Sequence, residues 1–237
     1  MSASHARLAT SAEPTMRVQA RRPAISSSGG GAGRFPRRRD SVADLFTGLR
    51  RVLDHLLHRS RRRAALASLT TRQPPASVLV LCSGNIFRSP FAAAVLRREL
   101  RRQGMGTMRV DSAGFTAAGR ASPPRAIAAA ARHGIDLAGH SSQLVVADLA
   151  RAADLIVVME DLQRRSICER FGRARRDVLL LGDLDPLPVM TRAIEDPVEQ
   201  DPEVCERVYA RIERCVRELG RVLGGVRTRN GKAGRDA

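Results

Sequence analysis

Cys82, Arg88 and Ser89 have the residue types and spacing of a nucleophilic site for phosphate esters. A thiol reacts as the thiolate, and a free Cys with a pKa near 8.5 is only about 3% ionised at neutral pH. Converging backbone N–H groups, a helix N-terminus and a neighbouring guanidinium all favour the thiolate. The planar Arg88 side chain can hold two phosphate oxygens, and the Ser89 hydroxyl can donate to the sulfur. This combination predicts that Cys82 attacks phosphorus.

The segment around these residues predicts a strand, a short loop and a helix N-terminus. Residues 78–81 are a continuous apolar run, typical of a strand buried on both faces. Pro90 suits the first turn of a helix. Such an arrangement forms a cradle for an anion, because backbone N–H groups and the helix dipole favour negative charge there. The predicted phosphate-binding loop comprises Ser83, Gly84, Asn85, Ile86, Phe87 and Ser89.

The alternative interpretation is that Cys82 is only a buried apolar residue at a strand end, which is common for Cys. This interpretation does not explain why the segment after Cys82 also contains Gly84, Asn85, Arg88 and Ser89. Gly84 allows close backbone approach, and Asn85 tolerates a positive φ in a tight loop. We therefore favour the phosphate site.

The net charge of +17 over 237 residues is unevenly distributed. Residues 1–75 contain 15 Arg against four acidic residues, whereas residues 76–237 contain 26 Lys or Arg against 20 acidic residues. A basic end favours an acidic surface such as anionic lipid or nucleic acid, and a solvated Arg- and Ala-rich tail is the alternative. Few aromatic residues accompany the basic ones, which makes nucleic acid an unfavourable candidate.

The four cysteines show neither zinc-ligand spacing nor a disulfide framework, so we expect no metal and no cofactor. A catalytic thiol needs a reducing compartment, which predicts a cytoplasmic protein. No run of about 20 apolar residues could span a bilayer, and the N-terminus lacks the apolar region of a secretion signal. Its Arg- and Ser-rich composition also fits an organelle transit peptide.

Composition predicts four parts: a disordered basic segment (1–40), an amphipathic helix with its linker (41–75), the catalytic domain (76–224) and a basic tail (225–237). Ser41 and Asp44 form a capping box. The predicted apolar stripe consists of Val42, Leu45, Phe46, Leu49, Val52, Leu53, Leu56 and Leu57. This stripe could pack on the catalytic domain or on a second copy of the chain. Alternatively, residues 41–63 could bind an anionic membrane surface and make the protein peripheral there, or bind another partner.

From residue 77 onward, predicted strands and helices alternate, which indicates an α/β fold with a four-stranded parallel sheet covered on both faces. The predicted strands are 78–81, 108–111, 155–159 and 178–181, and the predicted helices are 89–103, 124–133, 144–152, 162–171 and 202–222. Ligands of such sheets bind at the carboxyl ends of the strands, where Cys82 lies.

The segment 82–90 resembles the signature Cys-x-Gly-Asn-x-x-Arg-Ser-Pro of the low-molecular-weight protein tyrosine phosphatases, a flavodoxin-like family. Residues 110–114, 134–144 and 153–159 are similar to further blocks of that family. The resemblance implies hydrolysis of phosphotyrosine proteins or small phosphomonoesters through a cysteinyl-phosphate intermediate. It also implies that Asn85 bonds to Ser89, Ser112 and His140. Alternatively, Ser112 ends a strand and His140 caps a helix.

A general acid is needed to protonate the leaving oxygen. Asp201 precedes Pro202 and a long apolar stripe, so we expect it to cap the last helix. Asp185 and Asp196, each followed by Pro, remain as candidates. Asp196 is preferred because its Ile-x-Asp-Pro context resembles that of the family's acid.

Two features depart from the family pattern. Val198 follows the Asp196–Pro197 pair where many members have an aromatic residue, so Phe87 or Phe115 would have to supply ring contacts. Phe87 also replaces the second Cys that some members carry in the loop, which predicts no disulfide there.

The alternative functions are an arsenate reductase of the same fold and a non-catalytic phosphoprotein-binding module. The sequence sets no oligomeric state.

Overall fold

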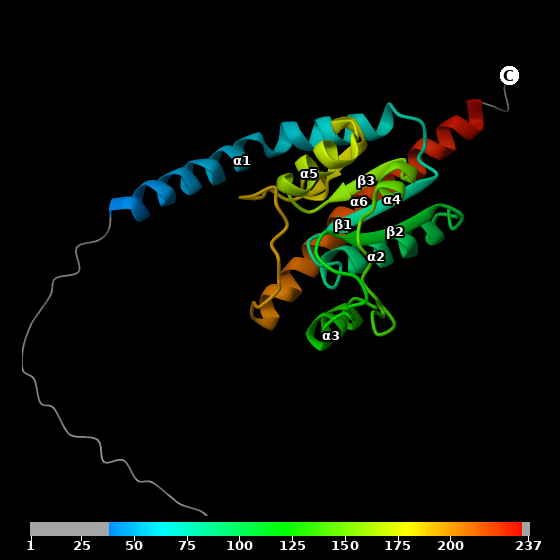
Figure 1. Cartoon of the computed structure of the whole chain (residues 1–237). Coiled ribbons are helices and arrows are strands. Elements are labelled where there is room, and N and C mark those ends of the chain that lie inside the picture. The colour runs from blue at the N-terminus through cyan, green and yellow to red at the C-terminus, as the bar shows by residue number, and fades with distance from the viewer. Residues whose placement is uncertain (1–37, 234–237) are drawn as a thin grey trace, which may run out of the picture. The chain divides into compact units, whose positions relative to one another are not determined.

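The computed structural model describes the backbone of residues 38–233, with side chains for residues 48–49 and 51–226 (Figure 1). Nearly all of the predicted disordered segment therefore lies outside the described residues. The helices are α1 (Arg38–Thr70), α2 (Arg88–Arg102), α3 (Pro124–Arg132), α4 (Ala147–Ala152), α5 (Asp161–Phe171) and α6 (Pro202–Ala233). The strands are β1 (Ser77–Cys82), β2 (Arg109–Gly114), β3 (Leu155–Val158) and β4 (Val178–Leu180), with short 3-10 turns at Arg175–Asp177 and Leu181–Leu184.

The four strands form one parallel sheet in the order β2-β1-β3-β4, so the predicted fold class is confirmed. β1 is central and pairs along its whole length with β2, from Ser77 opposite Arg109 to Cys82 opposite Gly114. On its other side it pairs with β3. The strand order reverses direction at β1, and the loop that follows Cys82 lies at this switch point, where open α/β sheets bind their ligands.

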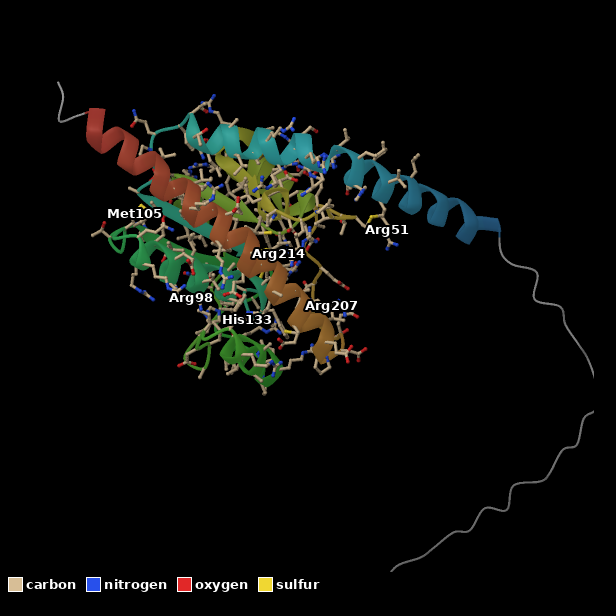
Figure 2. All side chains as sticks on the ribbon, turned by 180° about the vertical axis from the view of Figure 1, so that it is seen from behind. Arg51, Arg98, Met105, His133, Arg207 and Arg214 are labelled. Carbon is tan, nitrogen blue, oxygen red and sulfur yellow. The ribbon has the colours of Figure 1, made fainter. Side chains whose placement is uncertain are left out.

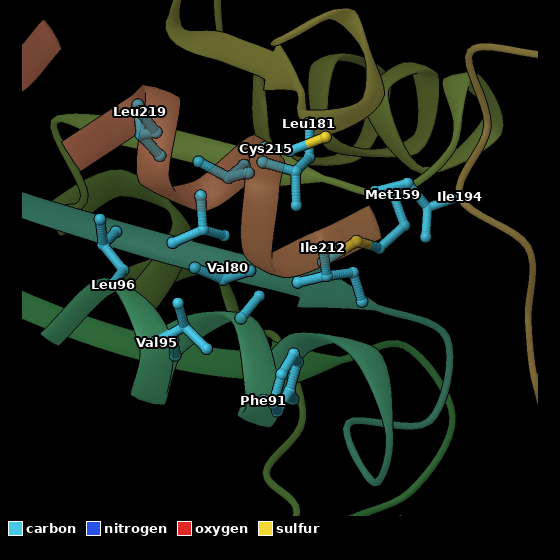
Figure 3. Close-up of a cluster of buried hydrophobic side chains, with 14 of the residues drawn as sticks. Val80, Phe91, Val95, Leu96, Met159, Leu181, Ile194, Ile212, Cys215 and Leu219 are labelled. Carbon is cyan, nitrogen blue, oxygen red and sulfur yellow. The ribbon is translucent and has the colours of Figure 1, made fainter. Parts of the chain in front are cut away.

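The two faces of the sheet bury separate apolar clusters, because side chains alternate along each strand. Val78, Val80 and Cys82 face the cluster formed with α2, α3 and α6, whereas Leu79 and Leu81 face the smaller cluster formed with α4 and α5. Figure 3 shows the first cluster, with Val80 from β1 between side chains of α2 and side chains of α6. This double burial explains the uninterrupted apolar run of β1.

Helix α1 packs on the catalytic domain through a different face from the predicted apolar stripe. Leu69, Asp54 and His58 are buried, at 1%, 7% and 3% exposed. Within the described side chains, the stripe faces solvent instead: its exposed members are Leu49, Val52, Leu53, Leu56 and Leu57, at 43–69%. The expectation that this stripe packs on the catalytic domain is therefore wrong: α1 docks through Leu69, which joins the larger apolar cluster, and through the polar contacts of Asp54 and His58.

Two helices run further than their patterns predicted. Helix α6 continues to Ala233, past the predicted end at 222, and α1 begins at Arg38.

Gly104 and Gly134 adopt φ of 71° and 68° just after α2 and α3, as left-handed residues at helix ends do. Arg51 projects from α1 into solvent (Figure 2). None of the helices within residues 38–233 is both long and apolar enough to cross a bilayer.

Candidate active site

The loop after β1 folds back over the sulfur of Cys82. The Asn85 backbone N–H lies 3.2 Å from Cys82 Sγ, and the Ser89 hydroxyl donates to the same sulfur at 3.0 Å. Cys82 is 2% exposed, while Ser83 and Gly84 in front of it are half-buried. Helix α2 begins at Arg88, so the sulfur lies close to a helix N-terminus. Two hydrogen-bond donors and the N-terminus of α2 therefore lie beside the sulfur.

Asn85 is the centre of the network that holds this loop. Its φ of 51° is a left-handed conformation. Its side-chain amide donates to Ser89 Oγ and Ser112 Oγ, both at 2.9 Å, and its Oδ1 accepts the backbone N–H of Gln143 at 2.9 Å. His140 Nε2 lies 2.6 Å from the Asn85 carbonyl oxygen. The bonds to Ser89, Ser112 and His140 are those that the resemblance implied, and they offset the cost of the left-handed backbone.

Two more contacts fix the loop backbone. The Ser83 carbonyl accepts the N–H of Phe115 at 2.7 Å, just beyond the end of β2. The Tyr209 hydroxyl of α6 donates to the Phe87 carbonyl at 3.2 Å, and its ring stacks on Phe91 at 4.0 Å between centroids. Burial raises the pKa of Tyr209, so its hydroxyl remains a donor. Residues from β2 and α6 therefore determine where the loop lies.

Arg88 is 1% exposed, and its guanidinium is held at both ends. Nη1 donates to Glu160 Oε1 at 2.6 Å and to the Ile194 carbonyl at 2.9 Å. Nη2 lies 3.3 Å from Ser83 Oγ and is bonded to the Asp196 carboxylate. The Arg88 guanidinium therefore lies between the Ser83 side chain of the loop and the Asp196 carboxylate.

The three Asp-Pro candidates have different surroundings. Asp196 is half-buried and contacts Arg88. Asp185 is fully buried and forms ion pairs with Arg211 and Arg214 of α6, at 3.0 and 2.7 Å. Asp201 directly precedes α6, and its backbone carbonyl accepts the N–H of Val204 at 3.0 Å. Only Asp196 of the three contacts the Arg88 side chain within the described bonds.

Sequence reasoning missed Glu160, Gln163 and Gln143. Glu160 and Gln163 lie just after β3, where the Gln163 amide contacts Glu160 at 3.2 Å and accepts the Met159 N–H at 2.9 Å. The Gln143 amide donates to the Ser112 carbonyl at 2.8 Å. The carboxyl end of the strand next to β1 is a general signal for ligand-site residues, and it could have indicated Glu160.

The predicted ring contacts are only partly available. Phe87 is 2% exposed and lies under Arg125, whose guanidinium carbon is 5.1 Å from the ring centroid. Phe115 is half-buried, and Val198 is 39% exposed. Among the four cysteines, all of which are free, Cys168 lies on α5 and Cys205 and Cys215 on α6. The described side chains form no cluster of three or more metal-ligating groups.

A cysteine thiol and an arginine lie at the two ends of one loop at the carboxyl edge of a parallel sheet, which is the arrangement expected of a cysteine-dependent phosphatase. A family model for the low molecular weight phosphotyrosine protein phosphatases matches residues 77–227. The chain is 34% identical over 148 residues to the low molecular weight protein-tyrosine-phosphatase Wzb of Escherichia coli K12, covering 62% of this chain and 95% of that protein. It is 36% identical over 141 residues to the probable phosphatase EpsP of Ralstonia solanacearum, covering 59% and 90%.

Solved structures agree with these matches. The crystal structure of Wzb from Escherichia coli K30 with sulphate superposes with a TM-score of 0.56 at 30% identity, covering 62% of this chain and 97% of that one. The chain belongs to the low molecular weight phosphotyrosine protein phosphatase family. The predicted function, a protein-tyrosine-phosphatase and hence a hydrolase, is confirmed at this level, and the reductase and non-catalytic alternatives are not favoured.

Proposed function

We propose that Cys82 is the nucleophile, that Arg88 holds the phosphate and that Asp196 is the general acid. The observation that carries this assignment is the contact of Arg88 with Asp196 at the mouth of the Cys82 loop. Cys82 attacks phosphorus in line, a cysteinyl-phosphate forms and the leaving oxygen takes its proton from Asp196. Water then hydrolyses the intermediate, with Asp196 accepting a proton. Ser89 donates to Cys82 Sγ and stabilises the departing thiolate.

The loop supplies electrostatic positioning in this mechanism. The backbone N–H groups of residues 83–88 and the Arg88 guanidinium bind the equatorial oxygens, whose charge grows toward the transition state. A phosphate on Arg88 competes with Asp196 for Nη2, and this frees the Asp196 carboxyl for the leaving oxygen. Asn85, Ser112 and His140 act indirectly, by keeping the loop in its left-handed conformation.

The assignment is tested by kcat/KM with two leaving groups. Cys82→Ser should abolish turnover of p-nitrophenyl phosphate. Asp196→Asn should lower kcat/KM about 100-fold for phenyl phosphate and much less for p-nitrophenyl phosphate, whose leaving group needs no proton. Asp201→Asn is the matched control and should leave both values unchanged. Equal losses for both substrates in Asp196→Asn would assign the acid elsewhere.

We also propose phosphotyrosine as the preferred side chain of the substrate. The burial of Cys82, which is 2% exposed, favours a long, flat side chain that can reach the sulfur. Matched phosphopeptides that differ only in carrying phosphotyrosine, phosphoserine or phosphothreonine test this. We expect kcat/KM at least tenfold higher for phosphotyrosine; equal values would refute the preference.

For α1 we propose peripheral binding to an anionic membrane surface. The observation that favours it is the solvent-exposed row of Leu49, Val52, Leu53, Leu56 and Leu57, with Arg51, Arg59 and Arg63 also exposed on the same helix. An amphipathic helix with this composition gains apolar burial and attraction to acidic lipid together.

Sedimentation with vesicles tests this proposal. The full chain should bind phosphatidylcholine vesicles that contain phosphatidylserine and should not bind phosphatidylcholine alone. Leu53→Glu with Leu56→Glu should abolish binding. Leu162→Glu is the control, because Leu162 on α5 is 70% exposed, as Leu56 is at 69%. Self-association that the double variant abolishes, without vesicle binding, would identify the stripe as a contact between copies instead.

A further inference from the structure

The segment between β4 and α6 carries Asp196, and it has no regular strand or helix after Leu184. Contacts within the family-matched region hold it at two places. Arg211 of α6 donates to the carbonyls of Thr191 and Ala193, at 2.7 and 2.9 Å. The Ile194 N–H donates to the Met159 carbonyl at the end of β3, at 3.0 Å. Asp196 follows two residues later, so its position depends on how firmly this segment is held.

Helix α1, which lies outside the residues matched by the family model, adds two contacts to the same segment. His58 Nε2 lies 2.9 Å from the carbonyl oxygen of Asp185, and both residues are buried. A carbonyl oxygen can only accept, so Nε2 carries the proton; Nδ1 is buried without a partner among the described atoms. The hydrogen bond from His58 Nε2 to the Asp185 carbonyl therefore ties α1 to this segment.

Asp54, one helical turn before His58, makes the second contact. It is 7% exposed and accepts the side chain of Arg61 and, at 3.4 Å, the backbone N–H of Arg192. The Arg192 side chain in turn pairs with Asp183, with Nε 2.8 Å from Oδ1. Both ends of the stretch 183–192 are therefore tied to each other, and α1 holds the stretch from outside.

We infer that His58 and Asp54 are positioning residues that hold the segment 183–196 and thereby place the Asp196 carboxyl at the leaving oxygen. The inference rests on the proposed role of Asp196. Neither residue touches the substrate. Both act by restricting the movement of the segment that leads to Asp196. Misplacement of a reacting group by about 1 Å can cost up to about 100-fold in rate. Helix α1 thus helps to position the general acid.

The test uses the full chain and again compares leaving groups. His58→Leu and Asp54→Asn should lower kcat/KM about tenfold for phenyl phosphate and less than twofold for p-nitrophenyl phosphate. His58→Gln should restore part of the loss, because its amide N–H can reach the Asp185 carbonyl. Arg62→Ala is the matched control: Arg62 lies on the same helix and pairs with Glu218 of α6, away from the segment. It should show no such dependence on the leaving group.

Equal losses for both substrates, or no loss, in His58→Leu and Asp54→Asn would overturn the inference. Thermal unfolding accompanies each assay, and if His58→Leu does not fold, the near-isosteric Asp54→Asn decides the outcome. Failure of the underlying function looks different: Asp196→Asn itself would then show no dependence on the leaving group. A normal Asp196→Asn result with unaffected α1 variants would refute only the positioning role.

Discussion

The Asp185 carboxylate and the Arg214 guanidinium form a two-bond ion pair, with Nε–Oδ1 at 2.7 Å and Nη2–Oδ2 at 2.9 Å. Figure 2 marks Arg214 on α6. Burial alone would raise the pKa of Asp185. The hydrogen bonds from Arg214 and from the Leu187 N–H, with the charges of Arg214 and Arg211, outweigh burial and lower it. This carboxylate is therefore a structural anion.

Asp185→Asn should reduce the free energy of unfolding by about 3 kcal/mol at pH 7, because it leaves two partly buried arginines without their anion. A lowered folded-state pKa gives stability that is complete above the unfolded value, near 3.9, and is lost as the pH falls through the folded value. The difference between wild type and variant should thus be constant down to about pH 5 and shrink below about pH 4. Urea unfolding across this range measures it.

Asp148→Asn is the control for that series. Among the side chains that the structure describes, Asp148 pairs only with Arg151 on the surface of α4, and it is 96% exposed. Its replacement should change the free energy of unfolding by less than about 0.5 kcal/mol at every pH. If the difference in free energy of unfolding between wild type and Asp185→Asn grows as the pH falls, the lowered pKa of Asp185 is contradicted.

Gly114→Ala should disable the loop. A Cβ at Gly114 would lie 2.8 Å from the Asn85 backbone nitrogen and 2.8 Å from the Ser83 carbonyl oxygen. The backbone must shift to relieve these contacts, so we expect a loss of at least 100-fold in kcat/KM with p-nitrophenyl phosphate. Gly139→Ala, where a Cβ meets nothing within 4 Å, should retain full activity. An active Gly114→Ala enzyme would mean that the loop tolerates displacement.

Asn85→Ala should cost more than Ser112→Ala. The first removes two donated bonds and one accepted bond, and it replaces Asn at a φ of 51°. The second removes one bond. At about 1 kcal/mol per bond, we expect falls in kcat/KM of about 100-fold and about fivefold, respectively. Steady-state kinetics with parallel thermal melts measure both, and equal effects would show that Asn85 acts through Ser112 alone.

Glu160→Gln should weaken the hold on Arg88. The carboxylate bonds Nη1 at 2.6 Å, and charge-assisted bonds to a buried guanidinium contribute about 1.5–3 kcal/mol. We expect kcat/KM to fall about tenfold. Glu195→Gln, an exposed neighbour of Asp196, removes the same charge without touching Arg88 within the described contacts and should have little effect. Equal losses would indicate a general effect of charge on substrate binding.

Several features were predictable because neighbours in the chain produce them. The apolar run of β1, the polar turn and Pro90 lie within thirteen residues, and their order alone gives strand, loop and helix N-terminus. The alternation of strands and helices likewise predicted the parallel sheet, which the structure confirms. Helix ends were less predictable, as α6 shows: Leu223 and Val226 remain buried beyond the predicted end at 222, and the helix continues to Ala233.

The sequence by itself determined the Cys82–Arg88 cradle and the sheet that presents it, since both follow from local order and apolar periodicity. Only the tertiary structure decided which partners the loop residues Asp185 and Asp196 contact and which face of α1 is buried. Asp185 and Asp196 have the same Asp-Pro context, but α6 arginines bind the first and Arg88 meets the second. The apolar stripe of α1 faces solvent, because buried polar contacts of Asp54 and His58, which no periodicity reveals, orient that helix.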